Sequence, residues 1–276
     1  MDRIRLIASD MDATLLDEQS QLPADFEETI HALAELGIRF APASGRPLYT
    51  LEAMFPTLQD ELVFIGDNGG AIRWKGQNLF TSEMSPEGWR ALNRLTRVQG
   101  DIAVLCGLES AYVERPFAVH DAVLRHFYTK IEYVDRLEDV TAPADKFTIY
   151  LPQHNAQQAY DTAYASQRSI YSVAVAGECW VDIMNPGVHK GAALQTLGQL
   201  WGLPSESMMA FGDTYNDAEM LQTVRYGFLM ENGSEPLRQK VPFLAPSHRK
   251  AGVMQVLHRV LAQNGCVCPE DFVPAH

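Results

Sequence analysis

Short apolar runs alternate with segments of helical periodicity in the first part of the chain. Residues 4–8 form a short apolar run, which is typical of a strand buried in a parallel sheet. Residues 23–36 then place Phe26 and Ile30 at helical spacing, and a second apolar run covers residues 38–43. This strand–helix–strand order favours a parallel pair of strands with a right-handed crossover.

The alternation returns in the last third of the chain, so the pattern predicts an α/β fold around one parallel sheet. We expect further strands at residues 62–65, 208–211, 227–230 and 243–245, and helices at residues 48–55, 218–223, 235–240 and 250–263, with another helix opened by residues 189–191. A β-hairpin is expected around Lys75-Gly76.

The segment that starts near Ser82 has a different texture. Helical patterns at residues 86–98, 118–128 and 156–166 alternate with short strands at 102–105, 111–113, 147–151, 172–176 and 179–183. This mixture predicts an α+β insert that is separate from the parallel sheet. Six polar or aromatic residues in it could meet a substrate, although a solvated or structural role is favoured for each: Glu114, Arg115, His120, Lys146, Glu178 and Trp180.

Composition narrows the possible partners. The 276 residues are 46% hydrophobic and 21% charged, and the net charge of −13 argues against general nucleic-acid binding, since phosphates would be repelled. A small anionic substrate stays possible, because a local cation can reverse the field at one site. No apolar run approaches the roughly 20 residues that span a bilayer, and no signal peptide is evident. We expect a cytoplasmic protein that does not bind membranes.

The four cysteines are Cys106, Cys179, Cys266 and Cys268, and none forms a C-x-x-C pair. We interpret them as free thiols of a reducing compartment rather than as a zinc site.

Two carboxylates follow the first strand, Asp10 and Asp12. Burying a bare carboxylate costs several kcal/mol unless a metal or a partner compensates it. Ligands of open α/β sheets lie just beyond the carboxyl ends of the strands. The pair therefore indicates a metal and a reaction, whereas an ordinary acidic turn is the simpler alternative.

Polar residues also follow the next two strands. The Ser44 hydroxyl and the Gly45 backbone N–H can both donate to a phosphate oxygen, but capping of a helix that starts near Pro47 is the favoured role of Ser44 taken alone. Asn68 lies in a Gly-rich turn after the third strand, and a turn role is favoured for it.

The last third of the chain adds a cation and two more acids. Lys190 opens a helix, although the helix dipole favours anions at that end. The position makes sense if the lysine and the helix N-terminus face an anion together. His189 is interpreted only as a neighbour of this site. Asp213 follows Gly212 at a strand end, and Asp217 would ordinarily be an N-cap.

These strand ends together allow one specific chemistry. Carboxylates from two strands can hold Mg²⁺, and Mg²⁺ with Lys190 can neutralise a phosphoryl group. One acid of the first pair can attack phosphorus, and the other can protonate the leaving oxygen and later deprotonate a water.

The ordered motifs resemble those of the haloacid dehalogenase (HAD) superfamily. The motifs are Asp10-Met11-Asp12-Ala13-Thr14-Leu15-Leu16, Ser44-Gly45-Arg46, Lys190-Gly191 and Gly212-Asp213-Thr214-Tyr215-Asn216-Asp217. Their spacing, together with Asn68-Gly69-Gly70, resembles the Cof-type phosphatases. The resemblance implies a Rossmann-like core of residues 1–83 and 185–276, with a C2B-type α+β cap at residues 84–184.

The resemblance also implies catalytic and metal-binding roles. Asp10 would be the nucleophile and an Mg²⁺ ligand, and Asp12 the general acid/base with its backbone carbonyl on the metal. Asp213 would bind Mg²⁺ directly, and Asp217 would support the metal shell, partly through water.

The phosphate would be held by five residues. These would be the backbone N–H groups of Met11 and Gly45, the Ser44 hydroxyl, Lys190 and Asn216.

One position departs from the Cof-type pattern, in which glycine usually stands where this chain has Ala13. Glycine tolerates backbone angles that alanine resists, so the loop could be shifted, although we expect activity to survive.

The sequence thus predicts an Mg²⁺-dependent phosphatase that acts through an aspartyl-phosphate on a small metabolite, of the sugar phosphate, pyridoxal phosphate or FMN class. A phosphomutase and a non-catalytic phospho-ligand binder are the alternatives. A receiver-like signalling module is disfavoured by the long insert, and a Rossmann dehydrogenase by the lack of G-x-G-x-x-G. We expect a monomer or a homodimer.

Overall fold

A computed structural model describes all 276 residues, and its larger part is built on one nine-stranded sheet. The strand order is β17-β15-β14-β13-β2-β3-β4-β5-β6. The six central strands are parallel: β2 (Leu6–Asp10), β3 (Arg39–Ala43), β4 (Val63–Gly66), β13 (Met208–Gly212), β14 (Tyr226–Met230) and β15 (Phe243–Ala245). The edges are antiparallel: β5 (Ala71–Trp74), β6 (Gln77–Thr81) and β17 (Val273–Pro274). This confirms the predicted α/β class.

Helices cover both faces of this sheet, which is why its strands read as continuous apolar runs. One face carries α1 (Phe26–Glu35), α2 (Leu48–Ala53) and α8 (Gly252–Ala262), and the other carries α6 (Lys190–Trp201) and α7 (Ala218–Thr223). We call this sheet and its helices the large lobe. A two-residue pair of strands, β1 (Asp2–Arg3) and β16 (Cys266–Val267), ties the N-terminus to the region after α8.

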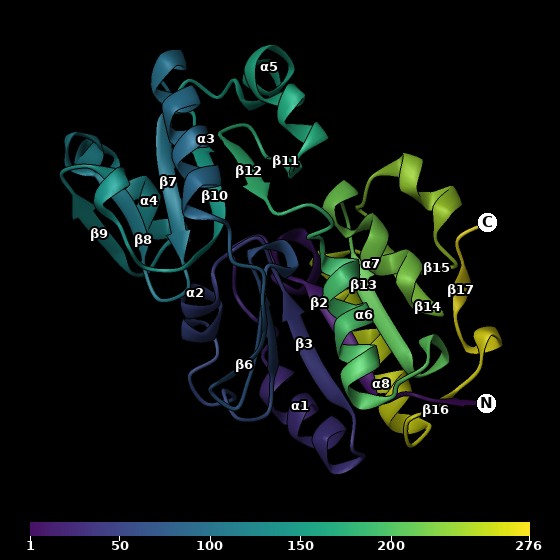
Figure 1. Cartoon of the computed structure of the whole chain (residues 1–276). Helices are drawn as coiled ribbons and strands as arrows, with labels where there is room; N and C mark the ends of the chain where they lie inside the picture. Colours follow the sequence, from purple (N-terminus) through teal and green to yellow (C-terminus); the bar gives the residue numbers. More distant parts are fainter.

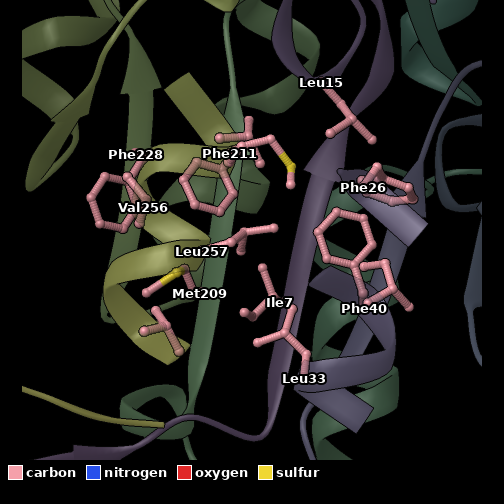
Figure 2. Packing of buried hydrophobic residues seen from close by; sticks show 14 of the residues in the cluster. Ile7, Leu15, Phe26, Leu33, Phe40, Met209, Phe211, Phe228, Val256 and Leu257 are labelled. Atoms are coloured by element: carbon pink, nitrogen blue, oxygen red, sulfur yellow. The ribbon is translucent and has the colours of Figure 1, made fainter. Parts of the chain in front are cut away.

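Side chains that alternate along the strands form the two cores of the large lobe. Ile7 and Met209 point to the face of α1 and α8, whereas their neighbours Leu6 and Met208 pack toward α6 and α7. Figure 2 shows the first of these cores, in which the helix side chains of Phe26, Leu33, Val256 and Leu257 meet the strand residues.

The residues between β6 and α6 contain a second sheet with its own apolar cores. Its order is β11-β12-β10-β7-β8-β9, with strands β7 (Ile102–Gly107), β8 (Ala111–Glu114), β9 (Ile131–Val134), β10 (Ala144–Tyr150), β11 (Ser172–Ala176) and β12 (Trp180–Met184). Its helices are α3 (Pro86–Gln99), α4 (Asp121–Phe127) and α5 (Ala156–Ala159). We call this part the small lobe. Figure 1 shows it as a separate unit at one end of the large lobe.

Two expectations for the small lobe differ from the structure. No strand was expected over Ile131–Val134. The structure has the short edge strand β9 there, which is defined by its parallel pairing with β8. Its side chains are exposed or only partly buried, so the sequence carries no clear strand pattern. The helix expected at 156–166 is interrupted, since α5 ends at Ala159 and the chain continues in a wide turn and then a tight one. The exact division of the chain at residues 83/84 and 184/185 stays a prediction.

The carboxyl ends of the parallel strands lie at the edge of the large sheet that faces the small lobe. Gly45 and Asn68, from the loops after β3 and β4, hydrogen-bond to Lys146 and Asp182 of the small lobe. The fold therefore places one end of the large sheet against the small lobe. No helix of the chain has both the length and the apolar character needed to cross a bilayer.

Candidate active site

Strand β2 carries Asp10 to the carboxyl edge of the sheet, where the residue is 8% exposed. The chain then makes one wide turn over Met11–Leu15, in which Ala13 adopts a φ of +58°. Glycine adopts this left-handed conformation without strain, whereas alanine adopts it at a cost in conformational energy. The Asn232 side-chain amide donates to the Ala13 carbonyl (2.9 Å). The turn places the next acid, Asp12, with its side chain 56% exposed.

Lys190 is the first residue of α6 and is completely buried. Its Nζ lies 2.5 Å from Oδ1 of Asp10 and 2.7 Å from Oδ1 of Asp217. The preceding residue, His189, caps the helix, since its Nδ1 accepts the N–H of Ala192 (3.1 Å). The lysine at this helix start thus faces two carboxylates, which accounts for its departure from the dipole preference.

Asp213 and Asp217 come from the loop after β13. Asp217 Oδ2 accepts the backbone N–H groups of Asp213 (3.0 Å) and Thr214 (3.3 Å), so its carboxylate closes the loop that precedes α7. Its other oxygen is taken by Lys190. Gly212 permits this fold of the loop, because a Cβ there would lie 2.4 Å from the Cβ of Asp217. Asp217 stands at the N-cap position of α7, as the alternative interpretation expected, but its carboxylate makes no capping hydrogen bond to that helix and accepts from the preceding loop instead.

Three carboxylates converge on one point. Asp10, Asp213 and Asp217 each offer an oxygen, and these oxygens lie within 4.8 Å of one another. Burial, with repulsion from Asp217, raises the pKa of Asp10 to about 8 and that of Asp213 to about 6, against the attraction of Lys190. Burial alone would lower the pKa of Lys190, but the attraction of Asp10 and Asp217 outweighs it and raises the pKa.

This donor set fits a hard divalent cation. One buried ammonium cannot balance three buried carboxylates, whereas a divalent ion would neutralise the remaining charge. Carboxylate oxygens are the ligands that such cations prefer, and the convergence of three of them matches this preference.

Ser44 and Gly45 lie beyond the end of β3, next to β2 in the sheet. Ser44 is buried, and its Oγ accepts the N–H of Arg46 (3.1 Å). Helix α2 begins only at Leu48 with Pro47 as its N-cap, so the helix-capping role of Ser44 is wrong. The serine hydroxyl keeps its proton free for donation, since the contact to Arg46 uses it as an acceptor.

Asp12 faces a different environment from Asp10. Both of its oxygens accept from Nη2 of Arg46, at 2.9 and 3.2 Å. The Arg46 guanidinium carbon in turn lies 5.8 Å from the ring centre of Phe127, at the end of α4 in the small lobe. The two acids of the first motif therefore differ in exposure and partners, as two different roles require.

Met11 and Asn216 complete the predicted set. The Met11 side chain is fully buried in the core beneath the site. Asn216 is exposed, and its Oδ1 accepts the Thr214 hydroxyl (2.6 Å), so the structure does not bring its side chain into the buried cluster.

Two residues at the site were not given a role by the sequence. Arg46 belongs to the motif Ser44-Gly45-Arg46 but had no expected role, and its guanidinium links Asp12 to the small lobe. Lys146 was interpreted as solvated or structural, yet it is 2% exposed and its Nζ donates to the Gly45 carbonyl (2.5 Å). The sequence signal that could have identified Lys146 is that it is the only cation within residues 144–151. The structure shows that all of these residues are buried, and a buried lysine is rare unless it is paired.

Comparisons with known proteins agree with this arrangement. The sequence model of the haloacid dehalogenase-like hydrolases matches residues 7–257. The chain is 31% identical over 262 residues to the 5-amino-6-(5-phospho-D-ribitylamino)uracil phosphatase YbjI of Escherichia coli, which covers 94% of this chain and 96% of that protein. It is also 31% identical over 255 residues to the HMP-PP phosphatase of Cronobacter sakazakii, with 87% and 89% covered.

Solved structures share the whole fold. SMU.1108c from Streptococcus mutans superposes with a TM-score of 0.84 at 28% identity and covers 94% of this chain and 99% of its own. A HAD/COF-like hydrolase from Plasmodium vivax, at 17% identity, has the same fold with a TM-score of 0.85. With the family match over most of its length and the two phosphatase relatives, the chain belongs to the haloacid dehalogenase-like hydrolases and is a phosphatase of their Cof type.

Proposed function

We propose that this protein is an Mg²⁺-dependent phosphatase that hydrolyses a small phosphorylated metabolite through an aspartyl-phosphate on Asp10. The observation that carries the proposal is the buried group at the sheet edge, where Lys190 contacts Asp10 and Asp217 while Asp213 completes a ring of carboxylates. A nucleophile, a cation for the phosphoryl oxygens and a set of metal ligands are thereby held on rigid elements.

Asp10 is the proposed nucleophile. One of its oxygens is held by Lys190, so the other is free to attack phosphorus. As the Asp10–phosphorus bond forms, the bond from phosphorus to the leaving oxygen breaks, and its electron pair goes to that oxygen. Lys190 favours the ionised carboxylate that this attack requires.

Asp12 is the proposed acid and base. Its exposed carboxyl protonates the leaving oxygen, and the resulting carboxylate later takes a proton from a water that attacks phosphorus. That second attack releases inorganic phosphate and restores Asp10. The Arg46 contact holds the Asp12 side chain toward the small lobe, on the side of the leaving group.

The metal and the phosphate have proposed ligands. Asp10, Asp213, Asp217 and the backbone carbonyl of Asp12 would hold Mg²⁺, which supplies positive charge for the phosphoryl oxygens when bound.

The N–H groups of Met11 and Gly45, the Ser44 hydroxyl and Lys190 would hold the phosphate oxygens. Asn216 would join them through a rearrangement of its exposed side chain away from Thr214.

The small lobe is the proposed cap, which excludes water and selects the leaving group. Beside Arg46 it presents a cluster of aromatic rings. The Phe127 and Trp180 centres lie 5.0 Å apart, and those of Trp180 and Tyr150 lie 4.6 Å apart. Rings of this kind favour a planar leaving group.

Among the expected substrate classes, these rings favour pyridoxal phosphate and FMN over simple sugar phosphates. A relative that is named for a uracil-bearing substrate is in line with this preference. We further propose a cytoplasmic location, in line with four cysteines that are all free thiols, and a monomer or a homodimer.

The test is phosphate release from a panel of phosphorylated metabolites, with Mg²⁺ and with chelator, by the wild-type protein and by Asp10→Asn. Asp161→Asn in the small lobe serves as the matched control, since this acid is exposed. Release that needs Mg²⁺, persists in the control and disappears in Asp10→Asn is the expected result.

Other outcomes would identify the alternatives. Interconversion of phosphate isomers that requires a bisphosphate would indicate a phosphomutase. Tight binding of phosphorylated ligands without any release would indicate a non-catalytic binder.

A further inference from the structure

The phosphate-binding loop after β3 has three consecutive backbone carbonyls, and each accepts a hydrogen bond from a different residue. The Ser44 carbonyl accepts the N–H of Asn68, and the Arg46 carbonyl accepts the N–H of Asp67, both at 2.9 Å. The Gly45 carbonyl accepts from Nζ of Lys146 at 2.5 Å. Two of the three donors belong to the large lobe, whereas Lys146 belongs to the small lobe.

The large-lobe donors are held rigidly. They lie in the turn Asp67–Gly69, where Asp67 and Asn68 have φ values of +50° and +55°. Gly69 packs so closely on the start of α6 that a Cβ there would lie 2.6 Å from the His189 carbonyl oxygen. Backbone strain of this kind persists only where the surrounding structure holds it, and it clusters at functional sites.

Lys146 is buried between the lobes with acids from both. Its Nζ lies 3.0 Å from Oδ1 of Asp67 in the large lobe and 3.7 Å from Oδ2 of Asp182 in the small lobe. Asp182 is itself fixed, since it accepts from Thr148 (2.8 Å) and from the Asn68 amide (3.1 Å). These contacts hold the ammonium on the Gly45 carbonyl.

The hydrogen bond of Lys146 continues into the proposed phosphate site. The Gly45 carbonyl belongs to the same peptide group as the Arg46 N–H, and that N–H donates to Oγ of Ser44 (3.1 Å). A cation on the carbonyl polarises the peptide and strengthens the bond that its N–H makes. With its oxygen used as an acceptor in this way, the Ser44 hydroxyl directs its proton elsewhere.

We propose that Lys146 is a positioning residue: by docking its ammonium on the Gly45 carbonyl, the small lobe orients the Ser44 hydroxyl for donation to the phosphate. The phosphate site is complete only when the small lobe sits on the large one. This inference rests on the proposed phosphatase function, and it adds a residue that touches neither phosphate nor metal.

The first variant is Lys146→Met, which keeps the length of the side chain and removes its charge. We expect kcat to fall by about 10–100-fold, the range seen when a residue that supports a ligand is lost. The inhibition constant of inorganic phosphate should rise as well, because the product occupies the same loop. Lys240→Met, at an exposed lysine, should change neither value.

A double-mutant cycle separates positioning from a merely structural role. In Ser44→Ala protein, Lys146→Met should lower kcat by less than threefold, because the group through which it acts is gone. Equal losses in both backgrounds would overturn the proposal, as would a folded Lys146→Met protein with kcat within twofold of the wild type.

Loss of the ammonium leaves Asp67 and Asp182 without their cation, so Lys146→Met could fail to fold. The same comparison is therefore repeated in Asp182→Asn protein, where less charge is left unpaired. A wild-type protein that releases no phosphate from any compound would refute the proposed function itself, and this outcome is distinct from an active wild type that does not respond to Lys146→Met.

Discussion

Replacement of Lys190 by methionine should destabilise the protein strongly, and most of all without a divalent metal. The side chain is fully buried, and its ammonium is the cation between Asp10 and Asp217. Methionine fills a similar volume but leaves the carboxylates without that charge. Removing one partner of a buried ion pair costs about 3–5 kcal/mol in free energy of unfolding.

The magnitude translates into a large thermal shift. For a chain of this length, about 1 kcal/mol corresponds to roughly 2–4 °C in Tm, so Lys190→Met should melt about 10 °C lower in chelator. A divalent cation at about 100 times its Kd adds about 2.7 kcal/mol. Because the variant site is more negative, Mg²⁺ should raise its Tm by more than it raises that of the wild type.

The assay is thermal unfolding by circular dichroism in chelator and in Mg²⁺, with the wild type and Lys240→Met as controls. Lys240→Met should melt with the wild type under both conditions, since this lysine is exposed. A Tm of Lys190→Met within about 2 °C of the wild type in chelator would refute the reasoning, because it would mean that the buried carboxylates do not depend on this cation.

Two further substitutions test the local energetics. Ala13→Gly should raise the free energy of unfolding, measured by urea titration, by about 0.5–1 kcal/mol. The left-handed backbone costs alanine about 1–2 kcal/mol, and the greater chain entropy of unfolded glycine offsets about 0.5–1 kcal/mol of the gain. A loss of stability would contradict this. Asp145 is fully buried, and neither of its carboxylate oxygens has a hydrogen-bond partner; burial first, and then Asp67, raise its pKa well above 3.8. The folded protein therefore binds this proton more tightly than the unfolded chain does, so the wild type should lose stability as the pH rises above 4. Asp145→Asn should be equal to the wild type in stability near pH 4 and more stable by about 1–3 kcal/mol at pH 8. The matched control Asp182→Asn, whose carboxylate is hydrogen-bonded, should lose stability at pH 8, and equal shifts in both variants would contradict the assignment.

The sequence by itself determined the parallel sheet and the acids at its edge. Short apolar runs such as residues 6–8 and 208–211 are typical of strands buried on both faces, and the acids that follow them, Asp10 and Asp213, could be placed at strand ends without coordinates. The unusual position of Lys190 at a helix start also indicated that an anion lies beside it, and the structure shows that Asp10 and Asp217 are its partners.

Local alternatives were resolved only by the tertiary structure. Ser44 lies three residues before Pro47, and Asp217 lies directly before a helix, so both match helix-capping patterns. The sequence alone therefore favoured a capping role for each. Which donors reach their oxygens depends on the path of neighbouring loops, and those donors proved to be Arg46 for Ser44, and Asp213, Thr214 and Lys190 for Asp217.

The contacts between the two lobes lie furthest from what the sequence determines. Lys146 is 101 residues from Gly45, and Phe127 is far along the chain from Arg46, so no local pattern links either pair. A lysine in a buried strand shows only that a compensating partner must exist, because burial of an unpaired ammonium is too costly. Which lobe supplies that partner is decided by the docking of one sheet on the other, and that geometry arises only once both lobes have folded.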